Sequence, residues 1–161
     1  MDNNSLQIRL AQKKDLASVF QMIKELADFH DLLDTVKANK EILQQSLFDD
    51  PKGPDVLIAE EKNQPIGFIV FFQNFSTFLG REGIYIEDLY IREKYRSKGY
   101  GKALLKEVCR IAEKRKCGRV EWKVLKGNQK AIGFYQKMGA IPASEWTTFR
   151  LTEPAFKALL K

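Results

Sequence analysis

Residues 95–108 read YRSKGYGKALLKEV, and this stretch decides how the rest of the chain is interpreted. Gly99 and Gly101 stand among basic residues, and apolar residues at helical spacing follow directly. A helix start offers unpaired N–H groups and the positive end of the helix dipole, and glycine lets a ligand approach the backbone closely. The stretch therefore predicts an anion site sized for a pyrophosphate. The alternative is a plain helix-entry turn with solvated basic side chains.

The composition indicates a globular protein, with 161 residues of which 44% are hydrophobic and 30% charged. This length suits one domain spanning residues 1–161. The sequence shows no apolar run of membrane-spanning length and no signal peptide, so we expect a cytoplasmic protein without a membrane partner. The net charge of +6 favours an anionic ligand, either nucleic acid or a phosphorylated cofactor. Because the basic residues are spread along the chain, nucleic acid is the weaker reading.

The metal-binding residue types are scarce. Cys109 and Cys117 have neither metal-site spacing nor histidine partners, so we expect both to be reduced and structural. His30 is the single histidine, which excludes a multi-histidine metal site. No metal is therefore expected.

Hydrophobic periodicity and turn residues predict the order β α α β β β α β α β, with a short helix at the end. The expected strands are 6–10, 55–61, 65–75, 84–91, 118–125 and 146–151. The expected helices are 13–30, 39–48, 101–116 and 128–138, with Asn39 and Asn128 as N-caps. Early antiparallel strands followed by helical crossovers indicate an α/β (α+β mixed sheet) fold, with helices on both faces of an antiparallel and parallel sheet.

Two familiar glycine motifs do not fit the loop. It lacks the spacing of a Walker loop, with its lysine and hydroxyl residue after the last glycine. It also lacks the third glycine of a dinucleotide fingerprint, and no βαβ unit opens the chain.

The segment R-S-K-G-Y-G (96–101) instead resembles the Q/R-x-x-G-x-G/A coenzyme A loop of the GNAT N-acetyltransferases. GNQKAIGFYQKMGA (127–140) resembles a later segment of that family, and residues 8–29 resemble its first strand and helix. The likeness covers nearly the whole chain and is greatest to the diamine branch, which holds the spermidine/spermine and thialysine N-acetyltransferases. It implies the GNAT acyl-CoA N-acyltransferase fold, with acetyl-CoA as co-substrate.

The resemblance also implies where the cofactor lies, in a gap between two parallel strands. Backbone groups of Leu89, Tyr90 and Ile91 would bind the pantetheine. Main-chain N–H groups would hold the pyrophosphate, from Arg96, Ser97, Lys98, Gly99, Tyr100, Gly101 and Lys102. Asn128 contacts the cofactor region in the diamine branch, although a plain N-cap is an equally good reading.

Catalytic roles follow from the same resemblance. Tyr135 corresponds to the general acid that protonates the departing thiolate, and its alternative is a core tyrosine. Glu87 corresponds to the base, acting through water because a carboxylate is a poor base for an ammonium with a pKa near 10. Asp88 would lie near the entry path of the amine. A regular strand points neighbouring residues to opposite faces, so only one of the two carboxylates would face a given cavity. Both could instead be solvated.

The sequence departs from the diamine branch in its substrate loop. Ser76 and Phe78 stand roughly where the branch has an acidic residue and a tryptophan, and Phe29-His30 replaces an aromatic-acidic pair. His30 is a candidate substrate contact, but a packed or solvent-edge histidine fits better. Trp146 is a candidate wall of the acceptor site, but core packing fits better.

The leading hypothesis is an enzyme that moves acetyl from acetyl-CoA to a primary amine of a diamine, a polyamine or a lysine-like amino acid. One alternative is a protein lysine or N-terminal acetyltransferase of the same fold. Another is a module that binds acyl-CoA or nucleic acid without chemistry. The resemblance implies a homodimer.

Overall fold

The computed structural model describes residues 6–160. The chain divides into two compact units, one up to Lys123 and the other from Val124 onward. Within residues 6–160, no helix has both the length and the apolar character needed to span a membrane.

The first unit contains a five-stranded sheet in the order β1-β2-β3-β4-β5. Its strands are β1 (Gln7–Leu10), β2 (Asp55–Glu61), β3 (Gln64–Ser76), β4 (Arg81–Ile91) and β5 (Val120–Trp122). Neighbours pair antiparallel up to β4, and β4 and β5 pair parallel. The mixed sheet that the sequence predicted is confirmed.

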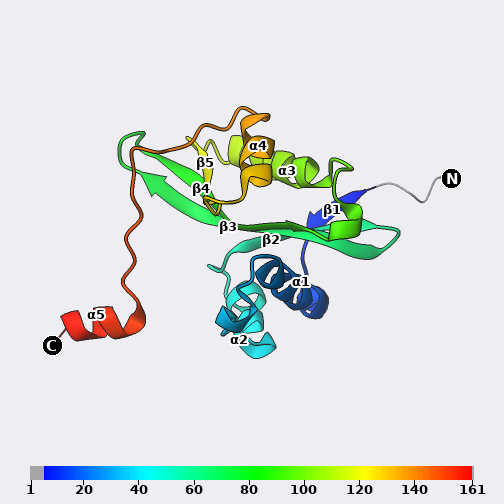
Figure 1. Cartoon of the computed structure of the whole chain (residues 1–161), viewed down its shortest axis with the longest axis horizontal. Coiled ribbons are helices and arrows are strands. Elements are labelled where there is room, and N and C mark those ends of the chain that lie inside the picture. Colours follow the sequence, from blue (N-terminus) through cyan, green and yellow to red (C-terminus); the bar gives the residue numbers. More distant parts are fainter. Residues whose placement is uncertain (1–5, 161) are drawn as a thin grey trace. The chain divides into compact units, whose positions relative to one another are not determined.

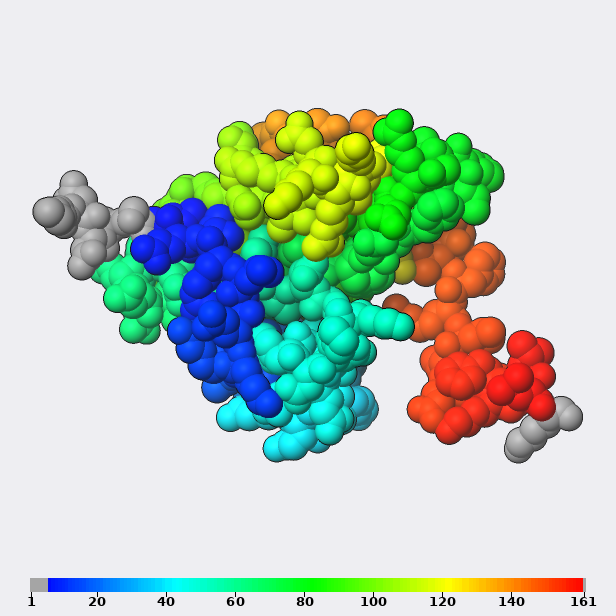
Figure 2. Space-filling view, turned by 180° about the vertical axis from the view of Figure 1, so that it is seen from behind, coloured from blue at the N-terminus to red at the C-terminus, as the bar shows by residue number. Residues whose placement is uncertain are grey.

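Helices cover both faces of this sheet (Figure 1). On one face lie α1 (Leu16–Phe29), which follows a 3-10 turn, and α2 (Lys40–Gln44), which continues into a π-helical turn. Figure 2 shows these blue and cyan segments next to one another. On the other face lies α3 (Tyr100–Lys114), which begins one residue earlier than the sequence predicted.

The core forms where apolar faces meet across the sheet. On the α1 face, Val19 and Met22 pack against alternate strand residues, namely Val56, Ile58, Phe68, Val70 and Tyr90. Adjacent strand residues point to opposite faces, so the buried Leu57, Ile69 and Phe71 face α3. From α3, Leu104, Leu105, Val108 and Ala112 are buried. These contacts hold the start of α3, and with it the glycine loop, at the end of β4.

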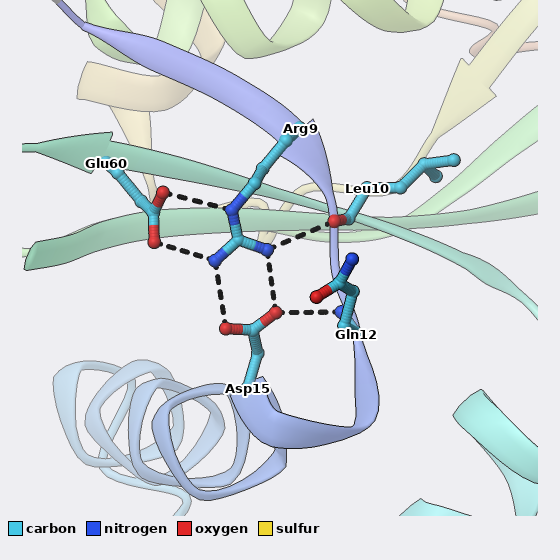
Figure 3. A network of polar contacts seen from close by, with 5 residues as sticks. All are labelled: Arg9, Leu10, Gln12, Asp15 and Glu60. Atoms are coloured by element: carbon cyan, nitrogen blue, oxygen red, sulfur yellow. Dashed lines mark hydrogen bonds and ion pairs between the residues drawn. The ribbon is translucent and has the colours of Figure 1, made fainter. Parts of the chain in front are cut away.

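A polar network fixes the first strand (Figure 3). Arg9 on β1 donates to both oxygens of Glu60 on β2, at 2.7 and 3.0 Å. It also donates to both oxygens of Asp15, at 2.7 and 2.9 Å. Asp15 in turn accepts the backbone N–H of Gln12 at 2.7 Å. The guanidinium therefore joins two strands to the turn that starts α1.

Three predicted strands differ from the structure, and the first, expected at 84–91, is longer because β4 begins at Arg81. The strand expected at 118–125 is β5, which ends at Trp122, and residues 146–151 form no strand. Among the described residues, nothing pairs with 146–151, and Trp146 is 69% exposed rather than packed in a core. A strand requires a partner backbone for its N–H and C=O groups, and an apolar pattern does not reveal that partner.

The second unit contains α4 (Gln129–Gln136) and α5 (Glu153–Leu159). The predicted caps are confirmed: Asn39 accepts the N–H of Ile42 at 2.8 Å, and Asn128 accepts the N–H of Ala131 at 3.1 Å. Gly139, with φ of +87°, follows α4 as the sequence predicted.

Candidate functional site

The strands β4 and β5 part at the level of Ile86. Their parallel ladder runs only from Ile84 to Ile86 on β4 and from Val120 to Trp122 on β5. Beyond it β4 continues to Ile91, with Leu89, Tyr90 and Ile91 still paired to β3 on the opposite edge. Among the described residues, no strand pairs with the β5-side edge of this extension. An extended ligand can therefore hydrogen-bond to this edge of β4 as an additional strand would.

The glycine loop follows β4 and shows the geometry of an anion site. Ser97 and Gly99 both have left-handed backbone, with φ of +65° and +84°. Alternation of right- and left-handed residues turns successive N–H groups toward one concavity. The N–H of Arg96 bonds to Glu93, and that of Ala103 bonds to Gly99. The N–H groups of Ser97 through Lys102 have no hydrogen bond within residues 6–160, which leaves them free to receive phosphate oxygens.

The loop side chains do not all point where a phosphate would lie. Arg96 donates from Nε to the carbonyl of Ile91 at 2.9 Å. The Tyr100 hydroxyl donates to Glu61, whose carboxylate also lies 3.8 Å from the ammonium of Lys98. Glu61 was not among the predicted residues, because it lies on β2 and only the fold brings it to the loop. Lys102 is exposed and, in the described part of the chain, has no ion pair.

The two predicted carboxylates lie at a β-bulge in β4. Val70 pairs with Asp88 and Phe71 pairs with Ile86, so Glu87 has no ladder partner. The sequence predicted that Glu87 and Asp88 point to opposite faces, which holds only for a regular strand. The bulge breaks the regular alternation at this point. Glu87 is exposed, whereas Asp88 is half-buried. Burial, followed by the nearby charge of Glu87, raises the pKa of Asp88 to about 6.

An aromatic and acidic surface adjoins these carboxylates. Tyr85 on β4 packs against Phe72 on β3, with ring centroids 5.3 Å apart. Burial raises the pKa of Tyr85, and the charges of Glu87 and Glu121 raise it further. Glu121 pairs with Tyr85 in the β4–β5 ladder and lies 2.8 Å from Arg119. Neither Tyr85 nor Glu121 was predicted from the sequence. The signal that could have suggested Tyr85 was an aromatic residue two positions before a candidate base in the same strand.

The acceptor candidate at the end of α1 is a packed residue. His30 is half-buried, and its ring meets that of Phe29 edge-on with centroids 5.1 Å apart. This agrees with the packed or solvent-edge reading. Its contact with a substrate stays a prediction.

Tyr135 and Asn128 belong to the second unit. Tyr135 is half-buried on α4, its ring lies 5.2 Å from that of Phe134, and burial raises its pKa. A tyrosine phenol is protonated at neutral pH with or without this shift, so the hydroxyl holds the proton that a general acid must give. Asn128 acts as an N-cap, and its cofactor contact stays a prediction. Within residues 6–160, no group of three or more His, Cys, Asp or Glu residues could hold a metal ion.

Residues 19–140 match the family described as the acetyltransferase (GNAT) family. The chain belongs to the GNAT acetyltransferase family. It is therefore an N-acetyltransferase, and acetyl-CoA is the co-substrate of the GNAT acetyltransferases.

Relatives of this GNAT chain include enzymes that are named for small amines. It is 43% identical over 136 residues to L-ornithine N5-acetyltransferase NATA1 of Arabidopsis thaliana, and the aligned region covers 83% of this chain. The chain spans 57% of the length of that plant protein. It is 32% identical to thialysine N-epsilon-acetyltransferase of Sus scrofa, over 96% of this chain and 97% of the relative.

Solved structures share the GNAT fold. An integron cassette protein from V. cholerae superposes with a TM-score of 0.82 at 25% identity, covering 98% of each chain. An aminoglycoside acetyltransferase, meta-AAC0020, in complex with trehalose superposes with a TM-score of 0.77, covering 94% of this chain and 97% of its own. At 20% identity, this second likeness shows the fold alone.

Proposed function

We propose that the chain transfers acetyl from acetyl-CoA to the primary amine of a small molecule, a diamine, a polyamine or a lysine-like amino acid. One observation carries the proposal. Ser97 and Gly99 have left-handed backbone, and the N–H groups from Ser97 to Lys102 at the start of α3 have no hydrogen-bond partner within residues 6–160. These groups follow β4, whose end has no strand paired to its β5-side edge within the same residues. Relatives named for ornithine and thialysine support an amine acceptor.

In this proposal each residue has one task. The edge of Leu89, Tyr90 and Ile91 aligns the pantetheine, and the amides of Ser97 through Lys102 hold the pyrophosphate; the amide of Arg96, which the sequence also predicted there, is bonded to Glu93 instead. The amine nitrogen attacks the thioester carbonyl, the carbon–sulfur bond breaks, and the amide product forms. Glu87 takes the proton of the amine through water. Tyr135 gives a proton to the departing thiolate.

A local group of carboxylates on β4 and β5 favours a cationic acceptor. Glu87, Asp88 and Glu121 are close enough to influence the pKa of Tyr85 or of one another, and the Tyr85 ring already has one ammonium, that of Lys123, 6.0 Å from its centre. Carboxylates and aromatic rings both attract ammonium groups. His30 and Trp146 are the further candidates for acceptor contact.

A thiol-release assay with acetyl-CoA tests the proposal against a panel of ornithine, lysine, thialysine, diamines, polyamines and aminoglycosides. We expect at least one small amine to be acetylated, with kcat/KM far above that for a lysine-containing peptide. Preference for the peptide would indicate a protein acetyltransferase. Tight acetyl-CoA binding without turnover of any amine would indicate a non-catalytic binding module.

We also propose that the chain forms a homodimer, which light scattering with size-exclusion chromatography tests directly. The large exposed apolar side chains of residues 141–160 support this, since such side chains mark association surfaces. They are Ile141, Trp146, Phe149, Leu151, Phe156, Leu159 and Leu160. A monomer at micromolar concentration would contradict it. Cytoplasmic location, a single domain and the lack of a nucleic-acid partner stay predictions.

A further inference from the structure

The side chain of Arg96 turns back from the glycine loop onto the body of the first unit. Its Nε donates to the carbonyl of Ile91 at 2.9 Å. Its guanidinium carbon lies 4.3 Å from the centre of the Phe29 ring and 5.5 Å from that of the Tyr90 ring. Arg96 is half-buried among these groups. The sequence predicted a basic side chain beside a phosphate. In the structure this guanidinium instead contacts the Ile91 carbonyl at the end of β4 and the Phe29 ring at the end of α1.

The backbone next to Arg96 needs such support. Ser97 has φ of +65°, a conformation that is unfavourable for residues other than glycine and persists only where its surroundings hold it. The Arg96 N–H bonds to Glu93, so its backbone and side chain are both tied down at the point where the loop starts. The unpaired N–H groups that begin at Ser97 therefore follow a residue whose position is fixed.

We propose that Arg96 is a positioning residue: its guanidinium, stacked on Phe29, holds the loop ready for the pyrophosphate and does not itself bind a phosphate. This inference rests on the proposed binding of coenzyme A at the loop. It gives Phe29 a role that no sequence pattern suggested. It also couples the C-terminal end of α1 to the cofactor loop.

The rival account is that Arg96 turns outward and pairs with a phosphate. The two accounts differ in what they require of the side chain. A phosphate contact needs a positive charge, which lysine also supplies. The stacked arrangement needs a planar guanidinium and an aromatic ring, which lysine and leucine lack.

The test measures the affinity of coenzyme A by calorimetry at several NaCl concentrations, for the wild type and for Arg96→Lys, Arg96→Gln, Phe29→Leu, Phe29→Tyr and the double variant Arg96→Lys/Phe29→Leu. We expect Arg96→Lys and Phe29→Leu each to weaken binding at least about fivefold, and the double variant to be no weaker than the worse single variant. Phe29→Tyr keeps the ring and should bind as the wild type does. The dependence of affinity on salt should not change, because no phosphate contact is lost.

Two results would overturn the inference. One is wild-type affinity in Arg96→Lys. The other is normal binding in Phe29→Leu together with a flatter salt dependence in Arg96→Gln, the mark of a lost charge contact. Phe29 is 53% exposed, so the Phe29 variants should fold, which circular dichroism checks. Failure of the wild type to bind coenzyme A would instead refute the proposed function.

Discussion

Asp88 on β4 pairs with Val70 on β3, on the sheet face that packs against α1, one residue after the bulge at Glu87. The bulge divides two adjacent carboxylates into an exposed one and a half-buried one. Because burial and the charge of Glu87 raise the pKa of Asp88 to about 6, Asp88 changes charge in the range where enzymes work.

Replacing Asp88 with asparagine should alter the pH dependence of acetyl transfer. The raised pKa means that Asp88 is ionised only above about pH 6, so an activity that needs its negative charge rises as the pH passes that value. In Asp88→Asn we expect this inflection in kcat/KM to disappear and the rate above pH 7 to fall by about tenfold or more. Rates measured from pH 5 to 9 check this.

Glu87→Gln is the matched variant for comparison with Asp88→Asn, because it neutralises the adjacent carboxylate. If Glu87 is the base, Glu87→Gln lowers the rate while the inflection persists at a lower pH, because the charge of Glu87 contributes to the raised pKa of Asp88. A normal rate in Glu87→Gln, with loss of the inflection only in Asp88→Asn, would transfer the role of base to Asp88. An inflection that survives in Asp88→Asn would show that another group produces it.

Replacing Tyr135 with phenylalanine removes one hydroxyl group and keeps the ring. A tyrosine hydroxyl is protonated at neutral pH, and burial raises the pKa of Tyr135 further, so the hydroxyl has a proton to give to the thiolate. We expect acetyl-CoA to bind normally by calorimetry while kcat falls at least about tenfold in the thiol-release assay. Unchanged turnover would remove Tyr135 as the acid.

Valine at position 99 should disturb the anion site through the backbone. Gly99 has φ of +84°, and a Cβ there meets nothing within 4 Å, so the cost of Gly99→Val is conformational strain rather than a clash. We expect coenzyme A to bind at least about tenfold more weakly, because relief of the strain moves the amides. Gly101→Val should also weaken binding, but by another route: Gly101 lies in the first turn of α3, where a branched side chain would hinder the close approach of a ligand to the backbone. Calorimetry measures both affinities.

Gly80, in the turn between β3 and β4, is the control for this change. It also has positive φ, +59°, and open space where a Cβ would stand. Gly80→Val should strain the turn to a similar extent while the affinity for coenzyme A stays normal. Equal losses in Gly80→Val and Gly99→Val would mean that strain anywhere in the unit weakens binding.

Asp15→Asn should destabilise the fold in a pH-dependent manner. The hydrogen bonds from Arg9 lower the pKa of Asp15, and its side chain is only 8% exposed. A carboxylate with a lowered pKa stabilises the fold at pH values above its unfolded pKa, and this contribution is lost as the pH falls through the folded pKa. We expect Asp15→Asn to lower the free energy of unfolding by about 2 to 3 kcal/mol at pH 7, and by less below about pH 4.

Urea unfolding at pH 7 and pH 3.5 measures this difference. The matched control is Asp49→Asn, which makes the same chemical change in an exposed pair with Lys13, whose side chain is 59% exposed. Exposed pairs contribute little, so Asp49→Asn should leave stability nearly unchanged. Equal losses in the two variants would contradict a special role for the Arg9 network.

Local sequence determined those parts of the protein whose causes lie within a few residues of one another. The caps at Asn39 and Asn128 and the glycine loop before α3 were predicted because a helix start depends on the residues around it. Short apolar runs bounded by turn residues likewise predicted β2 and β3.

Only the tertiary structure decided what depends on distant residues. The bulge at Glu87 arises from the register of β4 against β3, and the turned-back Arg96 depends on Phe29 at the end of α1. The strand expected at 146–151 is absent because a strand needs a partner backbone. A side-chain pattern states which residues favour burial or pairing, but the partners are set only when the chain folds and brings remote segments into contact.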